Sequence, residues 1–367
     1  MTCPVYQFKE PKPFAGDTFY NPYQHIDDDA WKKCVFHTHT KSWLGLTNGD
    51  NTFEEILDAY RQLDYDVVAI SDYMSINLHQ SHYLPYIPVY EHGYSIKKAH
   101  QLALGANKVV WRDYFFSQNK HQKQHIIDML KKHSQVVAIN HPKMRNSYLP
   151  DDLKYITSYD LFEVLNGTHV SEAEWDAALS SGHQAWLIAN DDAHSADSAC
   201  LQREVTYINV PTFDGKTCLD RMAQGVAFGI HFPRKKYKTM DELIHESAAV
   251  SFPVSINVDG DTLYIVWQKE MQRIDFIGDN GVILKTVTDS DAAFYPIQSE
   301  DSYIRIKLTS RENLIYFLNP VIRCSADQPL KQSISHIDIR KTIFKRVVFA
   351  FIFGIITICG IVFCFKK

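Results

Sequence analysis

The sequence lacks several features that would place it in a simple class. Its 7 cysteines include no Cys-x-x-Cys pair and no regular spacing, which is typical of reduced or buried thiols in a cytosolic protein. It also lacks an excess of positive charge, because 38 basic and 43 acidic residues give a formal net charge of -5. That balance argues against nucleic acid as the main partner. Residues 1–16 contain no apolar core of signal-peptide length, so we expect no secretory signal.

Two histidines spaced two residues apart follow a short apolar run. His37 and His39 come after Cys34-Val35-Phe36, and in a β-strand residues i and i+2 point to the same face. Two imidazoles at the end of one strand can therefore converge on a metal ion, because neutral imidazole is a common ligand of zinc and related ions. A His-x-His pair alone is more often a surface pair, so the interpretation depends on the rest of the chain.

Residue types that bind metals recur at the ends of later apolar runs. They are Asp72 after residues 67–70, His141 after 136–139, Glu163 after 161–162, and Asp192 with His194 after 186–189. This repetition is hard to obtain by chance. It indicates one site at which several strand ends meet.

Short predicted strands alternate with helical patterns from His37 to about residue 231. One helix is expected from the turn at residues 48–52 to Leu63, and another over residues 119–133. Six or more such units favour a barrel over a small open sheet. In α/β barrels the active-site residues gather at the C-terminal ends of the strands, so we expect a TIM-like barrel with its site there.

The pattern changes after about residue 250. Short alternating segments are separated by Asp-Gly, Asp-Asn-Gly and Ser-Glu-Asp turns, which predicts a small antiparallel β module, sandwich-like and without a cluster of catalytic residue types. The expected domains are an N-terminal arm (1–30), the hydrolase barrel (31–249), the β module (250–327), a basic linker (328–346) and a transmembrane helix (347–365).

The last segment, residues 347–365, is almost uninterruptedly apolar and long enough to span a bilayer. Its flanks are basic, more so before the segment than after it: Arg340, Lys341, Lys345 and Arg346 against Lys366 and Lys367. The more basic flank usually stays in the cytoplasm. We therefore expect a single-pass C-terminal anchor in the lipid bilayer, with the preceding domains on the cytoplasmic side.

Eight short motifs occur in a specific order. They are His37-Thr38-His39, Thr47-Asn48-Gly49, Ile70-Ser71-Asp72-Tyr73, Ile87-Pro88-Val89-Tyr90-Glu91, His100-Gln101-Leu102-Ala103-Leu104-Gly105, Asn140-His141-Pro142, Phe162-Glu163-Val164-Leu165-Asn166 and Asp191-Asp192-Ala193-His194. In order and spacing they resemble the PHP (polymerase and histidinol phosphatase) family of metal-dependent phosphoesterases, over roughly residues 33–231. The resemblance implies a distorted (β/α)7 barrel that binds up to three metal ions and hydrolyses phosphate esters.

The resemblance also implies which residues hold the metal ions. One ion would be held by two histidines, a glutamate and an aspartate, the glutamate would bridge to a second ion that a further histidine helps to hold, and one more histidine would face a third position. In that order these residues are His37, His39, Glu91, Asp192, His141 and His194.

The chain departs from the family pattern at two ligands of the third ion. Asn48 stands where the family has an aspartate, and Tyr73 where it has a histidine. Asn and Tyr bind divalent cations less well than carboxylate and imidazole do. We therefore expect two ions, or one, with His194 freed as a proton donor or anion contact.

These observations predict a metal-dependent hydrolase, first of all a phosphoesterase that uses a metal-activated water at a two-metal His/Asp/Glu site. The ligand set suits Zn, Mn or Fe. The expected catalytic residues are His194, Asp192 and Glu163, although Glu163 either orients a ligand histidine or pairs with neighbouring backbone or arginine. Lys143 and Arg145 either contact a small anionic, phosphorylated substrate or form a solvated basic loop.

Two other functions stay open at this point. A His-x-His pair with a later aspartate is also an amidohydrolase-like arrangement, which would hydrolyse a C–N bond or a lactone. Alternatively, a barrel with degraded metal sites would serve as a binding or scaffold module. Loss of two ligands favours the scaffold, whereas retention of the five ligands of the first two ions favours an enzyme.

Overall fold

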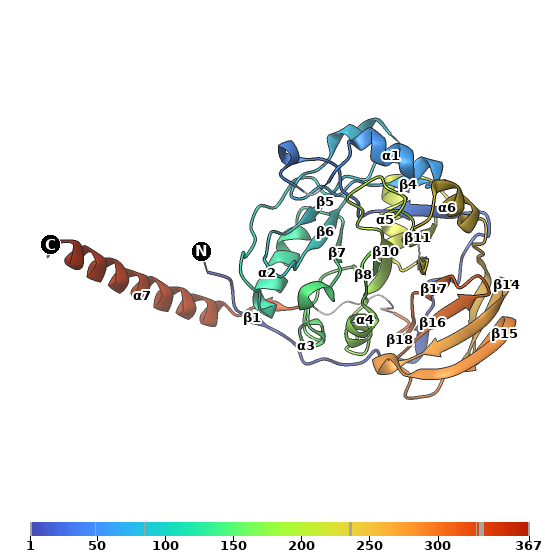
Figure 1. The fold of residues 1–367 in the computed structure, drawn as a ribbon. Helices are drawn as coiled ribbons and strands as arrows, with labels where there is room; N and C mark the ends of the chain where they lie inside the picture. Colours follow the sequence, from blue (N-terminus) through green and yellow to red (C-terminus); the bar gives the residue numbers. More distant parts are fainter. Residues whose placement is uncertain are drawn as a thin grey trace.

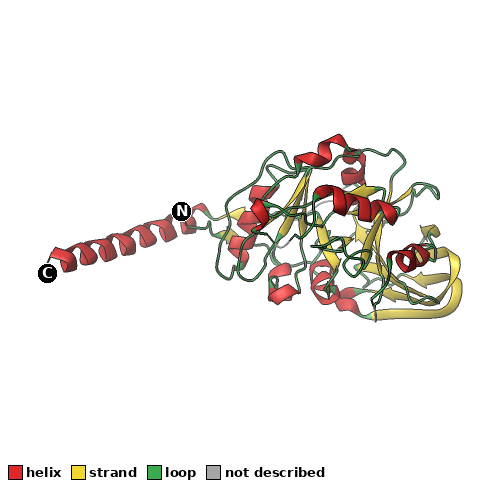
Figure 2. Cartoon of the chain, turned by 45° about the horizontal axis from the view of Figure 1, so that its top comes forward, coloured by secondary structure: helices red, strands yellow, loops and turns green. Residues whose placement is uncertain are grey.

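The computed structural model describes residues 2–47, 49–83, 85–234, 237–327, 329 and 334–365. Within them the chain forms two large open sheets flanked by helices, and a long C-terminal helix projects away from the body (Figure 1; Figure 2). Asn48, one of the two departures from the family pattern, lies outside the described residues.

The first sheet has six strands in the order β10-β8-β7-β6-β5, with β9 beside β8. All but β9 are buried throughout, which is why they read as short continuous apolar runs in the sequence. Their bounds are β5 (Val89–His92), β6 (Gln101–Leu104), β7 (Val136–Ile139), β8 (Leu161–Asn166), β9 (His169–Val170) and β10 (Trp186–Asn190).

The second sheet has eleven strands along the path β13-β14-β16-β17-β12-β11-β3-β4, with β15, β18 and β2 off this path. A separate two-stranded sheet pairs β1 (Tyr6–Gln7) with β19 (His336–Ile337). The strands of the second sheet are β2 (Thr18–Tyr20), β3 (Trp31–Val35), β4 (Val67–Val68), β11 (Glu204–Asn209), β12 (Ala227–His231), β13 (Pro253–Asp259), β14 (Thr262–Ile277), β15 (Ile283–Pro296), β16 (Tyr303–Ser310), β17 (Ile315–Leu318) and β18 (Val321–Cys324).

The helices include both that the sequence pattern indicates. The first begins at a capping box in which Thr52 accepts from the Glu55 backbone and Glu55 accepts from the Thr52 backbone, and Phe53, Ile56 and Tyr60 lie on its buried face. The bounds are α1 (Phe53–Gln62), α2 (Lys120–Leu130), α3 (Pro150–Leu153), α4 (Glu172–Leu179), α5 (Gly215–Ala223), α6 (Met240–Ser247) and α7 (Ile339–Phe365).

The predicted (β/α)7 barrel is wrong. Among the described residues neither sheet closes on itself, and many neighbouring strands run antiparallel, including β5–β6, β6–β7, β3–β11 and β11–β12. Of the strands that the structure describes, only β7–β8, β8–β10 and β3–β4 form parallel pairs. The residues between β5 and β6 form no helix, so the chain turns back beside itself instead of crossing over to a parallel position.

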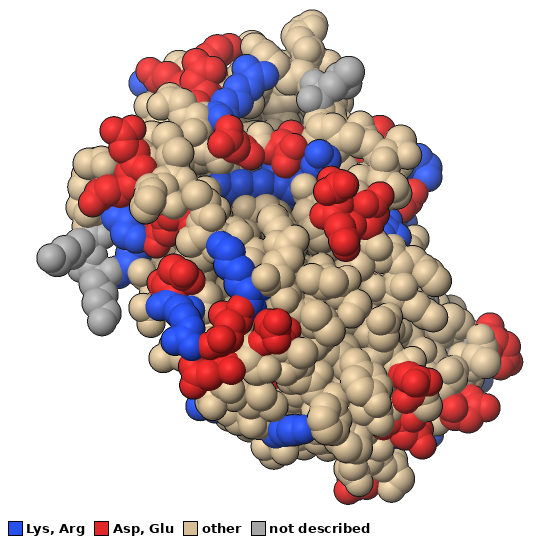
Figure 3. Space-filling view, turned by 90° about the vertical axis from the view of Figure 1, so that its right-hand side faces the viewer, with Lys and Arg blue, Asp and Glu red and all other residues tan. Residues whose placement is uncertain are grey.

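The predicted β module does not form a sandwich of its own. Its strand β17 pairs with β12, with Phe228 opposite Leu318 and Gly229 opposite Phe317, so the module continues the same sheet that contains β3. On the side of the molecule where β14 and β15 lie, acidic and basic side chains are interspersed with uncharged surface (Figure 3). The domain boundaries expected from the sequence stay a prediction.

The predicted transmembrane helix is also wrong. The helix that covers this region, α7, begins at Ile339, and Arg340, Lys341, Lys345 and Arg346 therefore lie within its first turns. In the part of the chain that the structure describes, no helix combines the length and the apolar character needed to cross a bilayer. The predicted membrane location, which was derived from residues 347–365, is therefore wrong as well.

Strand β3 lies between two hydrophobic clusters, and His37 and His39 follow it in the chain. Cys34 and Phe36 belong to the cluster beside the first sheet, whereas Trp31 and Val35 belong to the cluster beside α1 and β14. This division follows because successive residues of a strand point to opposite faces. The histidines come directly after this buried strand, so their backbone is fixed by the packing that precedes them.

Candidate metal centre

The ends of β3 and β10 lie side by side. The His39 backbone N–H donates to the Ala193 carbonyl (2.8 Å), the Asp192 N–H donates to the His37 carbonyl (3.0 Å), and Thr38 pairs with Ala193 in a parallel bridge. These contacts continue the strands past their regular ends. They bring the His37 and His39 side chains to that of Asp192, which the sequence places more than 150 residues away.

Glu91 and Asp192 face the first histidine pair. The Nε2 atom of His37 lies 3.2 Å from Asp192 Oδ1 and 3.3 Å from Glu91 Oε1. The Nε2 atom of His39 lies 3.2 Å from Asp192 Oδ1 and 3.4 Å from Glu91 Oε2. His37, His39 and Glu91 are buried, so this is an internal cluster and not a surface pair.

Glu91 also faces a second pair of histidines. Its Oε1 atom lies 2.8 Å from His100 Nδ1 and 3.1 Å from His141 Nε2, and the Asn140 side chain donates to it (3.2 Å). Four groups have ligand atoms that all lie within 4.8 Å of one another: His37, His39 and Glu91; Glu91, His100 and His141; His37, His141 and Asp192; His39, Asp192 and His194. Glu91 is therefore shared by two of the groups that could each hold an ion.

Glu163 lies behind the cluster and fixes its histidines. Its Oε1 atom lies 2.8 Å from His37 Nδ1, so that the Nε2 atom of His37 is the one that faces Glu91 and Asp192. The other carboxylate oxygen accepts from the His141 backbone (2.9 Å) and from the Asn166 side chain (3.1 Å). This is the arrangement by which a buried carboxylate orients a metal-binding imidazole.

The charges in the cluster shift its pKa values strongly. Burial alone would lower the pKa of His37, but the carboxylates of Asp192, Glu163 and Glu91 outweigh it and raise that pKa well above its usual value. Burial alone would raise the pKa of Glu91, but His100 and His37 hold it well below its usual range. Burial, together with the positive charge of His39, lowers the pKa of His194 to about 4. Burial alone would also raise the pKa of Asp192, but His37 and the hydrogen bond with His39 hold it below its usual value, so the charged form of both carboxylates depends on nearby positive charge.

The donor atoms fit divalent cations. His37 Nε2 lies within 3.3 Å of two carboxylate oxygens yet forms a hydrogen bond with neither, and His100 Nε2 and Glu91 Oε2 are likewise buried without a hydrogen-bond partner among the described residues. Buried polar groups normally find such partners. Imidazole and carboxylate atoms that converge in this way form a ligand set suited to Zn, Mn or Fe.

Tyr73 lies where the family pattern has a third-ion ligand. Its ring stacks on His39, with 4.5 Å between ring centroids and 13° between the planes, and His39 stacks in turn on His194 at 4.4 Å and 7°. Asp72, which ends one of the apolar runs, accepts from the backbone N–H and the hydroxyl of Thr40 (2.8 and 2.9 Å) and is in none of the groups that could hold an ion.

The structure thus brings His37, His39, Glu91, His141, Asp192 and His194 together, with Glu163 beside them. Their roles stay predictions. The two basic residues lie outside the cluster: Lys143 donates to the Val170 carbonyl (3.2 Å) and Arg145 to the Ile96 carbonyl (3.0 Å).

Sequence reasoning missed His100. It begins one of the eight motifs, and no metal-binding role is predicted for it, yet its Nδ1 lies 2.8 Å from Glu91 Oε1. The signal was present, because His100 directly precedes the buried strand β6, and β6 runs antiparallel to the strand that carries Glu91. The start of an antiparallel strand lies beside the end of its neighbour.

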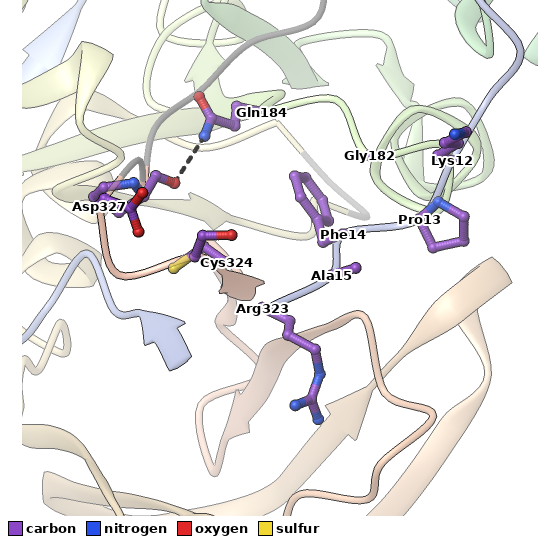
Figure 4. Close-up of a pocket in the computed structure, with 11 residues that line it drawn as sticks. Lys12, Pro13, Phe14, Ala15, Gly182, Gln184, Arg323, Cys324 and Asp327 are labelled. Carbon is purple, nitrogen blue, oxygen red and sulfur yellow. Dashed lines mark hydrogen bonds between the residues drawn. The ribbon is translucent and has the colours of Figure 1, made fainter. Parts of the chain in front are cut away.

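Two cavities of the molecule differ in their relation to this cluster. One, of about 650 Å³, has Tyr73 and His100 in its wall. The other, of about 460 Å³, is lined by the N-terminal arm and the end of β18, including Phe14, Arg323 and Cys324 (Figure 4). The lining residues of the second cavity include none of the clustered histidines or carboxylates, so only the first adjoins the candidate metal centre.

Comparisons with known proteins add little to this geometry. No protein-family profile matches the chain, and no curated protein matches its sequence. Among solved structures, it is similar to a two-domain protein containing a predicted PHP-like metal-dependent phosphoesterase from Bacteroides vulgatus ATCC 8482. That similarity has a TM-score of 0.43 and 14% sequence identity, and it covers 88% of this chain and 99% of the other.

Proposed function

We propose that the chain is a metal-dependent hydrolase, and more closely a phosphoesterase, with a centre for two divalent ions. The observation that carries the proposal is the position of Glu91. This buried carboxylate lies within 3.4 Å of four histidines, with His37, His100 and His141 at Oε1 and His39 at Oε2. It belongs to two of the groups that could each hold an ion, so it could serve both ions of a two-ion centre.

When bound, two divalent ions supply a water of lowered pKa and positive charge for the oxygens of a phosphate ester. His37, His39, Glu91 and Asp192 would hold one ion, and Glu91, His100 and His141 the other. Because Tyr73 stacks against His39 where a third ligand would stand, we propose no more than two ions. Zn, Mn and Fe all suit this ligand set.

The remaining residues position this centre and its substrate. Glu163 holds the Nδ1 side of His37 and the backbone of His141, so we assign it a positioning role. The side chain of His194 is 28% exposed, compared with 9% for Asp192 and 1% for His39, so a small anionic substrate would meet His194 first. Of the two predicted basic contacts, Arg145 lines the adjoining cavity and Lys143 does not.

The proposal is tested with the full chain after loading with Zn, Mn or Fe in turn. We expect hydrolysis of an aryl phosphate, and no hydrolysis of the matching aryl amide or of a lactone. His37→Ala should abolish turnover and remove at least one ion, because it deletes the imidazole whose Nε2 faces Glu91 and Asp192. The matched control is His245→Ala, which removes an exposed histidine of α6.

Three results would contradict the proposal in different ways. Turnover of only the amide or the lactone would replace the phosphoesterase by an amidohydrolase-like enzyme. A chain that binds no metal would leave a binding or scaffold module. Full activity of His37→Ala would show that the cluster is not the active site.

A further inference from the structure

The cavity beside the metal centre has an aromatic and largely apolar wall. Trp43 comes from the segment after β3 and Trp111 from the segment after β6, and their rings meet edge to face with centroids 5.8 Å apart. The Trp43 indole N–H donates to the Tyr73 carbonyl (2.7 Å), which ties this ring to the chain beside His39. Tyr94 and Met74 line the same cavity.

These aromatic rings are exposed instead of buried. Trp43 is 45% exposed, Trp111 60% and Tyr94 47%. Large apolar surfaces that gather around a cavity mark binding sites more often than chance exposure. Rings with an open face also provide a stacking surface for a planar ligand, since aromatic groups attract one another beyond the area they bury.

The charged groups of the cavity wall are basic. Lys98 and Arg145 line it, and the described lining residues include no carboxylate. The Lys98 ammonium lies 5.4 Å from the centre of the Tyr73 ring, near the boundary between the cavity and the metal centre. His100 lies in the same wall and is 1% exposed. Its Nε2 has no hydrogen-bond partner among the described residues.

We infer that this cavity binds the leaving group of the substrate, and that this group is a planar aromatic ring system carrying an anionic substituent. The inference rests on the proposed function, because it takes the metal centre as the site of the phosphoryl group. In the reaction, water adds to phosphorus and the bond to the aryl oxygen breaks. The electron pair leaves on that oxygen, which then takes a proton. The ring packs against the exposed surfaces of Trp43 and Trp111, and its anionic substituent meets Lys98 and Arg145.

The test measures binding of phosphonates that cannot be hydrolysed, by calorimetry on the metal-loaded full chain. The probes are methylphosphonate, benzylphosphonate and 4-(phosphonomethyl)benzoate. We expect benzylphosphonate to bind about tenfold more tightly than methylphosphonate, through stacking. The added carboxylate should give about a further fivefold, and that gain should shrink as the salt concentration rises.

Variants assign each gain to its residues. Trp111→Ala should reduce the preference for benzylphosphonate over methylphosphonate about tenfold, and its exposed position makes misfolding no obstacle. Phe116→Ala is the matched control, because Phe116 is 75% exposed and does not line the cavity; it should leave the preference unchanged. Arg145→Gln should reduce the gain from the carboxylate.

The outcomes separate this inference from the proposed function. If methylphosphonate binds but benzylphosphonate gains nothing, the aromatic subsite is overturned while the metal centre stands. If Trp111→Ala and Phe116→Ala change the preference equally, the ring lies elsewhere and the assignment is overturned. If methylphosphonate does not bind and no phosphate ester is hydrolysed, the proposed function itself fails.

Discussion

Replacing Glu163 by glutamine tests how the metal centre is held together. Four donors point at the two oxygens of this carboxylate. His37 Nδ1 (2.8 Å) and Asn190 Nδ2 (3.0 Å) face Oε1, and the His141 N–H (2.9 Å) and Asn166 Nδ2 (3.1 Å) face Oε2. In Glu163→Gln one oxygen becomes an NH2 group, so either placement of the amide sets a donor against two donors.

The magnitude follows from those lost contacts. Each buried group left without its partner costs about 1–3 kcal/mol. We therefore expect Glu163→Gln to lower the free energy of unfolding by at most a few times this cost. Metal affinity or turnover should fall about 10–100-fold, because His37 is no longer held in one orientation. Chelator competition measures the metal affinity, steady-state kinetics the turnover, and chemical denaturation the free energy of unfolding.

Glu204→Gln is the matched control for this experiment. Glu204 is also a buried glutamate, its Oε1 lies 2.7 Å from His231 Nδ1, and it belongs to none of the groups that could hold a metal. We expect a cost in stability but unchanged metal affinity. If Glu163→Gln keeps the metal affinity and turnover of the unchanged chain, or if Glu204→Gln loses as much, the positioning role is refuted.

The other predictions concern the rest of the molecule. Burial lowers the pKa of Lys33 to about 7, below its unfolded value, so the unfolded chain binds more protons between about pH 7 and 10. The free energy of unfolding should therefore rise with pH in this range, by up to about 1.4 kcal/mol per pH unit, and this gain should be lost again as the pH falls to 7. Lys33→Met should abolish the rise, and an unchanged slope in urea denaturation at several pH values would contradict the prediction. Asp176→Ala leaves buried Arg305 with Glu172 alone, at 3.2 Å, in place of the carboxylate that it contacts at 2.7 and 2.8 Å, and should lower the free energy of unfolding by about 3 kcal/mol with metal content unchanged. An unaltered denaturation midpoint would count against this ion pair. Asn48→Asp combined with Tyr73→His should raise the number of bound ions by one, as measured by elemental analysis, whereas unchanged occupancy would show that these positions do not correspond to the family's third site.

The convergence of these side chains was easier to predict than the fold because its signals are local. His37 and His39 share a strand face through their spacing, and Asp192 ends a buried apolar run, whichever way the neighbouring strands run. Strand direction is not local. The pairing of β5 with β6 as antiparallel neighbours depends on contacts that no short segment encodes. For this reason the barrel was predicted wrongly and the position of His100 beside Glu91 was not predicted.

The prediction of a separate β module was wrong for a related reason. Residues 253–324 have the alternation of a small β module, and the structure does make them strands. Pairing of β17 with β12, nearly ninety positions apart in the chain, is what merges them with the sheet of β3. Such a pairing is decided by which buried faces fit together, and the turn residues that mark strand ends carry no information about it.

The most direct test of the two-ion centre is elemental analysis of the purified full chain beside Glu91→Gln. The account predicts two divalent ions per chain, and loss of both in Glu91→Gln, because this one carboxylate belongs to both groups of histidines that would hold the ions. A chain without bound ions, or a Glu91→Gln variant that keeps two, would contradict it.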